Sequence, residues 1–481
     1  MIILQHAELV RCDLRARMPF RYGIATMTDV PQLVARLTFE IDGKTQRGLA
    51  ADLLPPKWFT KDPDTLFEAD LAEMLAVIQN ASRIAENAAQ KPVSFFAWWQ
   101  ALHEEQASWA KLRSQPALLA NLGVSLLERA VLDGLCRATN TPLHPLMRSE
   151  ALQIDFGEIH PELRGRKVAS VVLERPLAQV LVRHTVGLGD PLHASEAKLL
   201  DDGLPQSLEE SIHAYGLSCF KIKLSGQLEV DLLRLRQITA VLVENCQQGF
   251  QVTLDGNEQF SDLNDFRLAY ERLSSDRSLE PLFRSLLLVE QPLARTHALM
   301  DDFAAKLADW PEAPRLIIDE SDGALEDLPR ALSLGYSGTS HKNCKGIVKS
   351  LANAALIQGR AASGGRPLIQ TAEDLANVGP VALLQDLAVV AMLGLSHVER
   401  NGHHYFRGLS MYPDFVQQQV LAKHADLYRS HEAGFATLNI CDGKLNLQSV
   451  NAAPFGCGVD LEVGQFSTLK TWIMSGGMGM L

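Results

Sequence analysis

Two hydrophobic patterns divide the chain. In residues 1–150, alternating apolar and polar positions, as in "PQLVARLTFEIDGKTQRGLAA", predict antiparallel strands, with "DG" as a hairpin turn. Apolar positions at helical spacing then predict helix from Asp64 to Ala110 and again in "LLANLGVSLLERAVLDGLCRAT". We therefore expect an α+β domain over residues 1–150, followed by an irregular connection over 151–178.

From residue 179 to residue 430, short apolar strands alternate with helical segments. The eight strand candidates are "AQVLVRHTVG", "CFKIKL", "FQVTLDGN", "SLLLVEQPL", "RLIIDES", "SGTSHKN", "PLIQTAED" and "LSHVERN". Such alternation predicts parallel pairing, and eight units predict a closed (β/α)₈ barrel of the TIM type. Strand and turn signals return over 431–481, and we expect this segment to pack back on the first domain and complete it.

Composition narrows the class of partner. The 481 residues are 47% hydrophobic and 21% charged, which is normal for a globular protein. The net charge of −12 argues against nucleic acid or an anionic membrane as a partner. No apolar run approaches the roughly 18 residues of a transmembrane helix, and the N-terminus lacks a secretory pattern. Seven cysteines without a close pair favour a reduced, cytoplasmic protein.

Charged residues stand at the ends of five successive barrel strands. In order along the chain they are Lys223, Asp255, Glu290, Asp319 and Lys342. Side chains at the carboxyl ends of barrel strands converge on the active site, so three carboxylates should meet between two amines. A hard divalent cation would relieve the repulsion between the carboxylates; we expect Mg²⁺, with Mn²⁺ as a substitute. A partly desolvated lysine near such an ion could act as a general base.

Each feature alone has an ordinary structural explanation. A single acid after a strand is more often a helix cap or a turn residue, and a single lysine there is more often solvated. Lys345 is the alternative to Lys342, and Glu320 is the alternative to Asp319 as the third metal ligand. The ordered set of five favours a shared site.

This ordered set resembles the enolase superfamily, specifically the mandelate racemase/muconate lactonizing enzyme family and its K-x-K subgroup. The matching segments are "FKIKL", "LDGNE", "VEQPL", "IIDES" and "SHKNCKG". Further resemblance in "LLERAVLDGLCRATNTPLHPLM" and "DGKLNLQSVNAAPFGCGVDLE" covers most of the chain. It implies an enolase-like barrel with a capping domain, a small carboxylate as substrate, and a homo-oligomer.

The resemblance also implies a role for each site residue. The three carboxylates would bind Mg²⁺, and Lys223 and Lys342 would exchange protons on opposite faces of the substrate's α-carbon. Lys221 would assist Lys223 or contact the substrate carboxylate, and loop aromatics such as Trp58 could cover the barrel mouth. Candidate substrate-binding residues are Asn257, Glu320, Phe20, Tyr22, Glu373, Glu399 and His403.

The implied reaction is abstraction of the proton α to a carboxylate, through an enediolate. A lysine on each face would give racemisation or epimerisation, and reversed addition would give cycloisomerisation, so the enzyme would be an isomerase. The alternative is a dehydratase or other syn-elimination lyase acting on an acid sugar or a succinyl-type substrate. A Schiff-base lysine aldolase and a non-catalytic barrel are two further alternatives.

Overall fold

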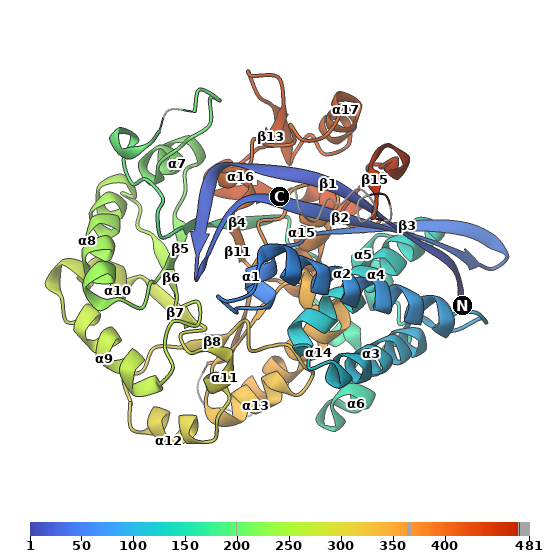
Figure 1. The fold of residues 1–481 in the computed structure, drawn as a ribbon, viewed down its shortest axis with the longest axis horizontal. Coiled ribbons are helices and arrows are strands. Elements are labelled where there is room, and N and C mark those ends of the chain that lie inside the picture. Colours follow the sequence, from blue (N-terminus) through green and yellow to red (C-terminus); the bar gives the residue numbers. More distant parts are fainter. Residues whose placement is uncertain (199, 363–366, 470, 472–481) are drawn as a thin grey trace.

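The structure is a computed structural model that describes residues 1–198, 200–362, 367–469 and 471. A capping domain, built on an antiparallel sheet, lies beside a closed parallel barrel (Figure 1). Within the described residues, no helix is long and apolar enough to cross a membrane.

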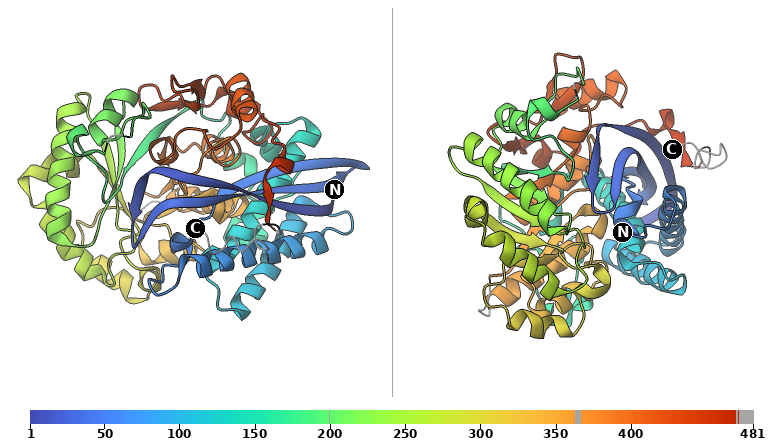
Figure 2. Two further views of the ribbon diagram at one scale, coloured as in Figure 1. Left: turned by 45° about the horizontal axis from the view of Figure 1, so that its top comes forward. Right: turned by 60° about the vertical axis from the view of Figure 1, so that its left-hand side comes forward.

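The capping sheet is formed mainly by the first three strands. They are β1 (Ile2–Tyr22), β2 (Ala25–Ile41) and β3 (Lys44–Leu53), and the sheet order is β15-β1-β2-β3. The predicted "DG" turn is confirmed: Asp42 and Gly43 both have positive φ, at 50° and 76°, as a two-residue turn of this type requires. Figure 2 shows that the β1–β2 ribbon reaches from the capping domain toward the barrel.

Four helices complete the capping domain: α2 (Phe67–Ala88), α3 (Phe95–Leu112), α4 (Ala117–Thr139) and the short α5 (Leu143–Arg148). Of these, α2 and α4 pack against the sheet, and α3 packs against both of them. The single helical stretch expected from Asp64 to Ala110 is broken in two, because Pro92 disfavours helix in the residue before it. Ser94 then begins α3 by accepting a hydrogen bond from the backbone N–H of Ala97 at 3.4 Å.

The predicted eight-stranded barrel is confirmed, and it closes where the last strand pairs with the first. Its strands, in order, are β4 (Gln179–Val186), β5 (Cys219–Lys223), β6 (Gln251–Asp255), β7 (Leu286–Glu290), β8 (Leu316–Ile318), β9 (Gly338–His341), β10 (Ile369–Ala372) and β11 (His397–Arg400). The longer helices between and after them are α7 (Leu208–Tyr215), α8 (Leu228–Asn245), α9 (Leu263–Ser274), α12 (Asp302–Ala308), α13 (Asp327–Leu334), α14 (Ile347–Ala361), α15 (Ala382–Leu393) and α17 (Asp414–Lys423). Shorter helices are α1 (Pro56–Phe59), α6 (Phe156–Ile159), α10 (Glu280–Arg284), α11 (Arg295–Ala298), α16 (Gly402–Tyr405) and α18 (Gln448–Ala452).

The sixth barrel strand, β9, is unusually polar, and its neighbours explain why. The Thr339 hydroxyl donates to Asp322 at 2.7 Å, and the Ser340 hydroxyl donates to Asp319. Gly338 has φ of 151°, and a Cβ there would lie 1.7 Å from the carbonyl oxygen of Ile369, so only glycine fits. A strand of apolar residues could not hold the acidic groups at the end of β8.

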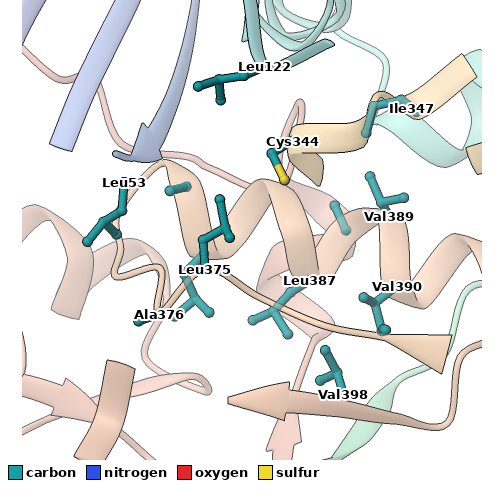
Figure 3. Close-up of a cluster of buried hydrophobic side chains, with 14 of the residues drawn as sticks. Leu53, Leu122, Cys344, Ile347, Leu375, Ala376, Leu387, Val389, Val390 and Val398 are labelled. Atoms are coloured by element: carbon teal, nitrogen blue, oxygen red, sulfur yellow. The ribbon is translucent and has the colours of Figure 1, made fainter. Parts of the chain in front are cut away.

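The two domains share a continuous core (Figure 3). Leu53 and Leu122 of the capping domain belong to the same buried cluster as Cys344 and Leu387 of the barrel. A buried polar contact lies nearby: Glu128 on α4 accepts hydrogen bonds at 2.8 Å from the first two backbone N–H groups of α14. The capping domain therefore helps to fix the barrel loop that precedes α14.

The C-terminal segment contacts both domains. β14 (Lys444–Asn446) pairs antiparallel with barrel strand β4, and β15 (Ser467–Thr468) pairs with β1. A separate hairpin joins β12 (Tyr428–Ser430) to β13 (Ala436–Leu438). The return to the capping domain is thus present in the described part of 431–481, together with an attachment to the barrel; the rest of that segment lies outside the described residues.

Candidate active site

The charged residues at the barrel strand ends lie together. The strand register pairs Lys223 with Asp255, and Asp255 with Glu290, so these three residues stand at one level of the barrel. Asp319 directly follows β8, and Lys342 directly follows β9. All five side chains are buried. Parallel register therefore brings together residues that the sequence spaces far apart.

Each lysine expected to handle protons contacts one carboxylate. Lys223 Nζ lies 2.6 Å from Asp255, and Lys342 Nζ lies 2.5 Å from Asp319. Lys345 lies 2.8 Å from the other oxygen of Asp319 and also donates to the backbone oxygen of Ser340 at 3.0 Å. Lys342 lines the cavity described below, whereas Lys345 is not among its lining residues.

Lys221 is surrounded by carboxylates at the floor of the site. Its Nζ lies 3.0 Å from Asp255, 2.8 Å from Glu290, 2.7 Å from Glu373 and 3.0 Å from Glu399. The side chain is 1% exposed. Strand alternation places Lys221 on the same face as Lys223, one step deeper in the barrel. Lys221 thus joins carboxylates from four strands.

Burial and neighbouring charges shift the pKa values of these groups in opposite directions. Burial alone would raise the pKa of Asp255, but Lys221 and Lys223 bring it below its usual value. For Asp319 the neighbouring lysines likewise outweigh burial, and its pKa is well below the usual range. Burial, followed by the charge of Glu373, raises the pKa of Glu290 well above normal.

Glu320 has a different environment from Asp319. Burial, together with the negative charge of Asp319, raises the pKa of Glu320 to about 7. One of its oxygens accepts from the Asn257 side-chain amide at 3.1 Å. Its other oxygen and the Asn257 side-chain oxygen are buried, and neither has a hydrogen-bond partner among the described residues.

Gln291 positions the third carboxylate, a role that the sequence did not suggest. Its side-chain oxygen accepts from the backbone N–H groups of Asp319, at 2.8 Å, and Ser321, at 3.2 Å. Its amide donates to Leu293 O and the Ser321 hydroxyl, both at 2.8 Å. The segment "EQP" was a signal, because a buried amide after a strand must satisfy its hydrogen bonds nearby.

The acidic cluster can be tested for its fit to a metal ion. Across residues 1–198, 200–362, 367–469 and 471, no three His, Cys, Asp or Glu side chains lie close enough together to hold one. The carboxylates are kept apart by Lys221, whose amine lies between Asp255 and Glu290. The donors themselves are hard oxygens, and the unpartnered oxygens of Glu320 and Asn257 add to them. The chemistry of the donor set fits Mg²⁺, and binding requires the lysine amines to move aside.

A small cavity of about 30 Å³ is lined by the two outer lysines, Lys223 and Lys342. Its lining comprises Phe20, Tyr22, Met27, Pro55, Trp58, Lys223, Lys342, Asp374, Leu375, Ala376, Glu399 and Asn401. The first five come from the β1–β2 hairpin and from Pro55 and helix α1, which follow β3, so the capping domain forms the roof. The volume holds about two water molecules. A carboxylate substrate can therefore enter only when the roof moves.

The proposed substrate-binding residues fall into three groups. Phe20, Tyr22 and Glu399 line the cavity. Glu373 lies beneath it and pairs with Arg183 and Lys221. Asn257 and Glu320 bond to each other at the strand ends, outside the cavity lining.

His403 lies apart from the cavity lining, in a group of buried histidines. Its Nε2 is 3.0 Å from the Nδ1 of His184, and His404 lies close to both. Asn401, which does line the cavity, was missed from the sequence. It follows the eighth strand directly in "VERN", so the strand-end rule applied to the other residues would have found it.

Solved structures with the same architecture identify the fold. Muconate lactonizing enzyme from Pseudomonas fluorescens, complexed with muconolactone, matches with a TM-score of 0.61 and 17% identity, over 97% of this chain and 99% of that one. A mandelate racemase/muconate lactonizing protein from Herpetosiphon aurantiacus matches at 0.58 and 18%, over 96% and 99%. Dipeptide epimerase from Enterococcus faecalis V583, complexed with Mg and L-Leu-L-Tyr, matches at 0.57 and 15%, over 92% and 99%.

These matches define an enolase-like fold over almost the whole chain: a closed parallel barrel with an N-terminal capping domain. No protein-family model and no curated protein matches the sequence. At 15–18% identity, the likeness shows the fold and leaves the reaction to be argued from the site itself.

Proposed function

We propose that this protein is a Mg²⁺-dependent enzyme that removes the proton α to the carboxylate of a small substrate, with racemisation, epimerisation or cycloisomerisation as the outcome. One observation carries the proposal. Lys223 and Lys342 come from the second and sixth barrel strands, and both line one cavity bordered by acidic strand ends. Two amines on either side of one cavity suit proton transfer at either face of a carbon atom.

The acidic strand ends supply the metal site in this proposal. Asp255, Glu290 and Asp319 would hold the ion, with Glu320 as the alternative to Asp319. When bound, Mg²⁺ would stabilise the negative charge that develops on the substrate carboxylate. This role explains why carboxylates on three neighbouring strands are buried together.

The two lysines would then have unlike roles at the start of the reaction. Lys223, after it leaves Asp255 and releases a proton to solvent, would accept the proton from the α-carbon as a neutral amine. Lys342 would begin as the proton donor, because the charge of Asp319 raises its pKa above normal despite burial. Reprotonation from the Lys342 side inverts the carbon, whereas loss of a β-substituent would give a lyase product instead.

Hydrogen–deuterium exchange tests the proposal. We would incubate the protein with Mg²⁺ in D₂O together with dipeptides, succinyl amino acids, acid sugars, muconolactone and mandelate, and follow the α-proton by NMR. We expect at least one compound to lose its α-proton signal, and EDTA to stop the exchange. The same spectra distinguish inversion, ring closure and elimination.

Two results would contradict the proposal. Covalent trapping of a carbonyl substrate by borohydride, with no effect of EDTA, would instead support a Schiff-base lysine. Absence of exchange in every compound, together with no Mg²⁺ binding, would support a non-catalytic barrel.

A further inference from the structure

We propose that Arg295 and Glu258 form a clamp that holds Trp58 over Lys342, and that these residues thereby position one of the two reactive amines. Glu258 belongs to the barrel loop after β6 and Arg295 is the first residue of α11, whereas Trp58 lies in the short helix α1 of the capping domain. At this clamp, residues of the barrel therefore hold part of the capping domain over the cavity.

The clamp is built from hydrogen bonds that a guanidinium is suited to make. Arg295 Nε and Nη2 donate to the two oxygens of Glu258 at 2.8 and 2.7 Å. The same guanidinium donates to the backbone carbonyls of Phe59, at 2.8 Å, and Trp58, at 3.0 Å. Bidentate pairing fixes the plane of the guanidinium, so that its remaining N–H groups point to the backbone carbonyls of Trp58 and Phe59.

Glu258 is held in place for this task. Its oxygen also accepts the backbone N–H of Arg295 at 2.8 Å, and Lys61 of the capping domain lies 3.3 Å away. Asn257 and Glu258 both have positive φ, at 45° and 64°. Two non-glycine residues in this conformation carry backbone strain that the surrounding contacts must offset. The strained turn directs Glu258 away from the metal-ligand candidates and toward Arg295.

The clamped helix α1 places the Trp58 ring over the Lys342 amine. Lys342 Nζ lies 4.2 Å from the centre of the Trp58 ring, within cation–π range. Trp58 is 7% exposed and packs edge-on against Phe59, with ring centres 4.8 Å apart. The Lys342 amine thus has Asp319 on one side and the indole on another, and Lys342 and Trp58 both line the cavity. The ring shields the amine from bulk water and restricts the direction in which it can reach.

Labelling of Lys342 tests the clamp without any substrate. We would acetylate the protein with an N-hydroxysuccinimide ester and follow each lysine by peptide mass spectrometry. Arg295→Gln should raise the labelling rate of Lys342 at least about tenfold, because each lost charged hydrogen bond shifts loop opening by about that factor. Trp58→Leu should do the same, whereas Trp58→Phe keeps an aromatic face and should stay within about threefold of the wild type.

Matched controls separate the clamp from general loosening. Arg267 also donates to a backbone carbonyl, that of Asp309 at 2.9 Å, and lies over the ring of Trp310, but on α9. Arg267→Gln should leave Lys342 labelling unchanged. Lys349 is buried beside Asp322 and should remain unlabelled in every variant. If Arg295→Gln exposes Lys349, the chain has loosened, and Glu258→Gln provides the decisive variant.

The clamp is wrong if Arg295→Gln and Glu258→Gln both leave Lys342 labelling within twofold of the wild type while Trp58→Leu raises it. The inference rests on the proposed function only for its consequence in catalysis. There, Arg295→Gln should slow exchange at the face served by Lys342 and spare the face served by Lys223. If no compound exchanges its α-proton, the proposed function fails, and the labelling result still decides whether the clamp exists.

Discussion

The two halves of the barrel mouth contain the same types of residue but use them differently. On the β5–β9 half, Lys223 and Lys342 each contact one carboxylate and face the cavity. On the half formed by β10, β11 and β4, Glu373 is paired with Arg183 and Lys221. Glu399 accepts from the Thr185 hydroxyl at 2.6 Å and from Asn401 at 3.2 Å, in addition to Lys221.

The difference shows which carboxylates are available for chemistry. Glu373 and Glu399 have their oxygens paired with donors of the protein, so they form a closed network under the cavity. Among the described residues of the other half, Glu320 keeps an unpartnered carboxylate oxygen beside the unpartnered amide oxygen of Asn257, whereas the unpartnered oxygen of Asn401, after β11, belongs to a neutral amide. Buried polar groups are normally paired, and an unpaired oxygen in a charged cluster points to a missing ligand. We therefore assign a stabilising role to the half formed by β10, β11 and β4, and the candidate site to the β5–β9 half.

The largest expected effect separates the two halves by metal binding. Glu290→Gln should abolish binding of Mn²⁺, used as a probe for Mg²⁺, and with it any α-proton exchange, because one charged donor is lost. Glu373→Gln, on the other half, should retain Mn²⁺ binding. Calorimetric titration of both variants measures this. Loss of binding in Glu373→Gln alone would reverse the assignment of the two halves.

The next effect concerns the two lysines of the cavity. Lys223→Ala and Lys342→Ala should each slow exchange at one face by about 10²–10⁴-fold, the usual contribution of a positioned acid or base. Mn²⁺ binding should persist in both variants. NMR exchange with each enantiomer of a substrate gives the face. Full activity of both variants would refute the role of these amines.

Lys221 gives the largest expected effect on stability. Lys221→Met removes the cation shared by four buried carboxylates, and we expect the free energy of unfolding to fall by about 3–5 kcal/mol. Urea unfolding followed by circular dichroism measures it. The control is Lys167→Met, whose ion pair with Glu150 is exposed and should change stability by less than about 1 kcal/mol. Equal effects would mean that the network under the cavity adds little.

The smallest effect is the pH dependence that one buried histidine, on β4 of the stabilising half, contributes to stability. Burial lowers the pKa of His184 to about 4. Because the folded state favours the neutral ring, its contribution is complete above pH 6.5 and is lost as the pH falls toward 4. At pH 5 the loss is about 2 kcal/mol for one such histidine. His184→Gln should therefore reduce the difference in melting temperature between pH 7.5 and pH 5, and an unchanged difference would contradict the shift.

The barrel, the capping sheet and the order of the charged strand ends could be predicted from the residue pattern alone. Strand alternation and spacing carry that information locally, since each strand, helix and loop repeats at a regular interval. The same reasoning predicted Lys223, Asp255, Glu290, Asp319 and Lys342 as neighbours, because the ends of parallel strands meet at one edge of a barrel.

The pairing of these charges, in contrast, depends on contacts that form only in the folded barrel. Nothing local to "FKIKL" shows that Lys221 meets carboxylates from β10 and β11, about 150 and 180 residues away, as well as from β6 and β7. Nor does the sequence around Trp58, in α1, indicate that Arg295 of the barrel holds this ring over Lys342. Periodicity fixes which face a side chain takes, whereas its partner depends on which distant strands and loops the closed barrel brings against that face.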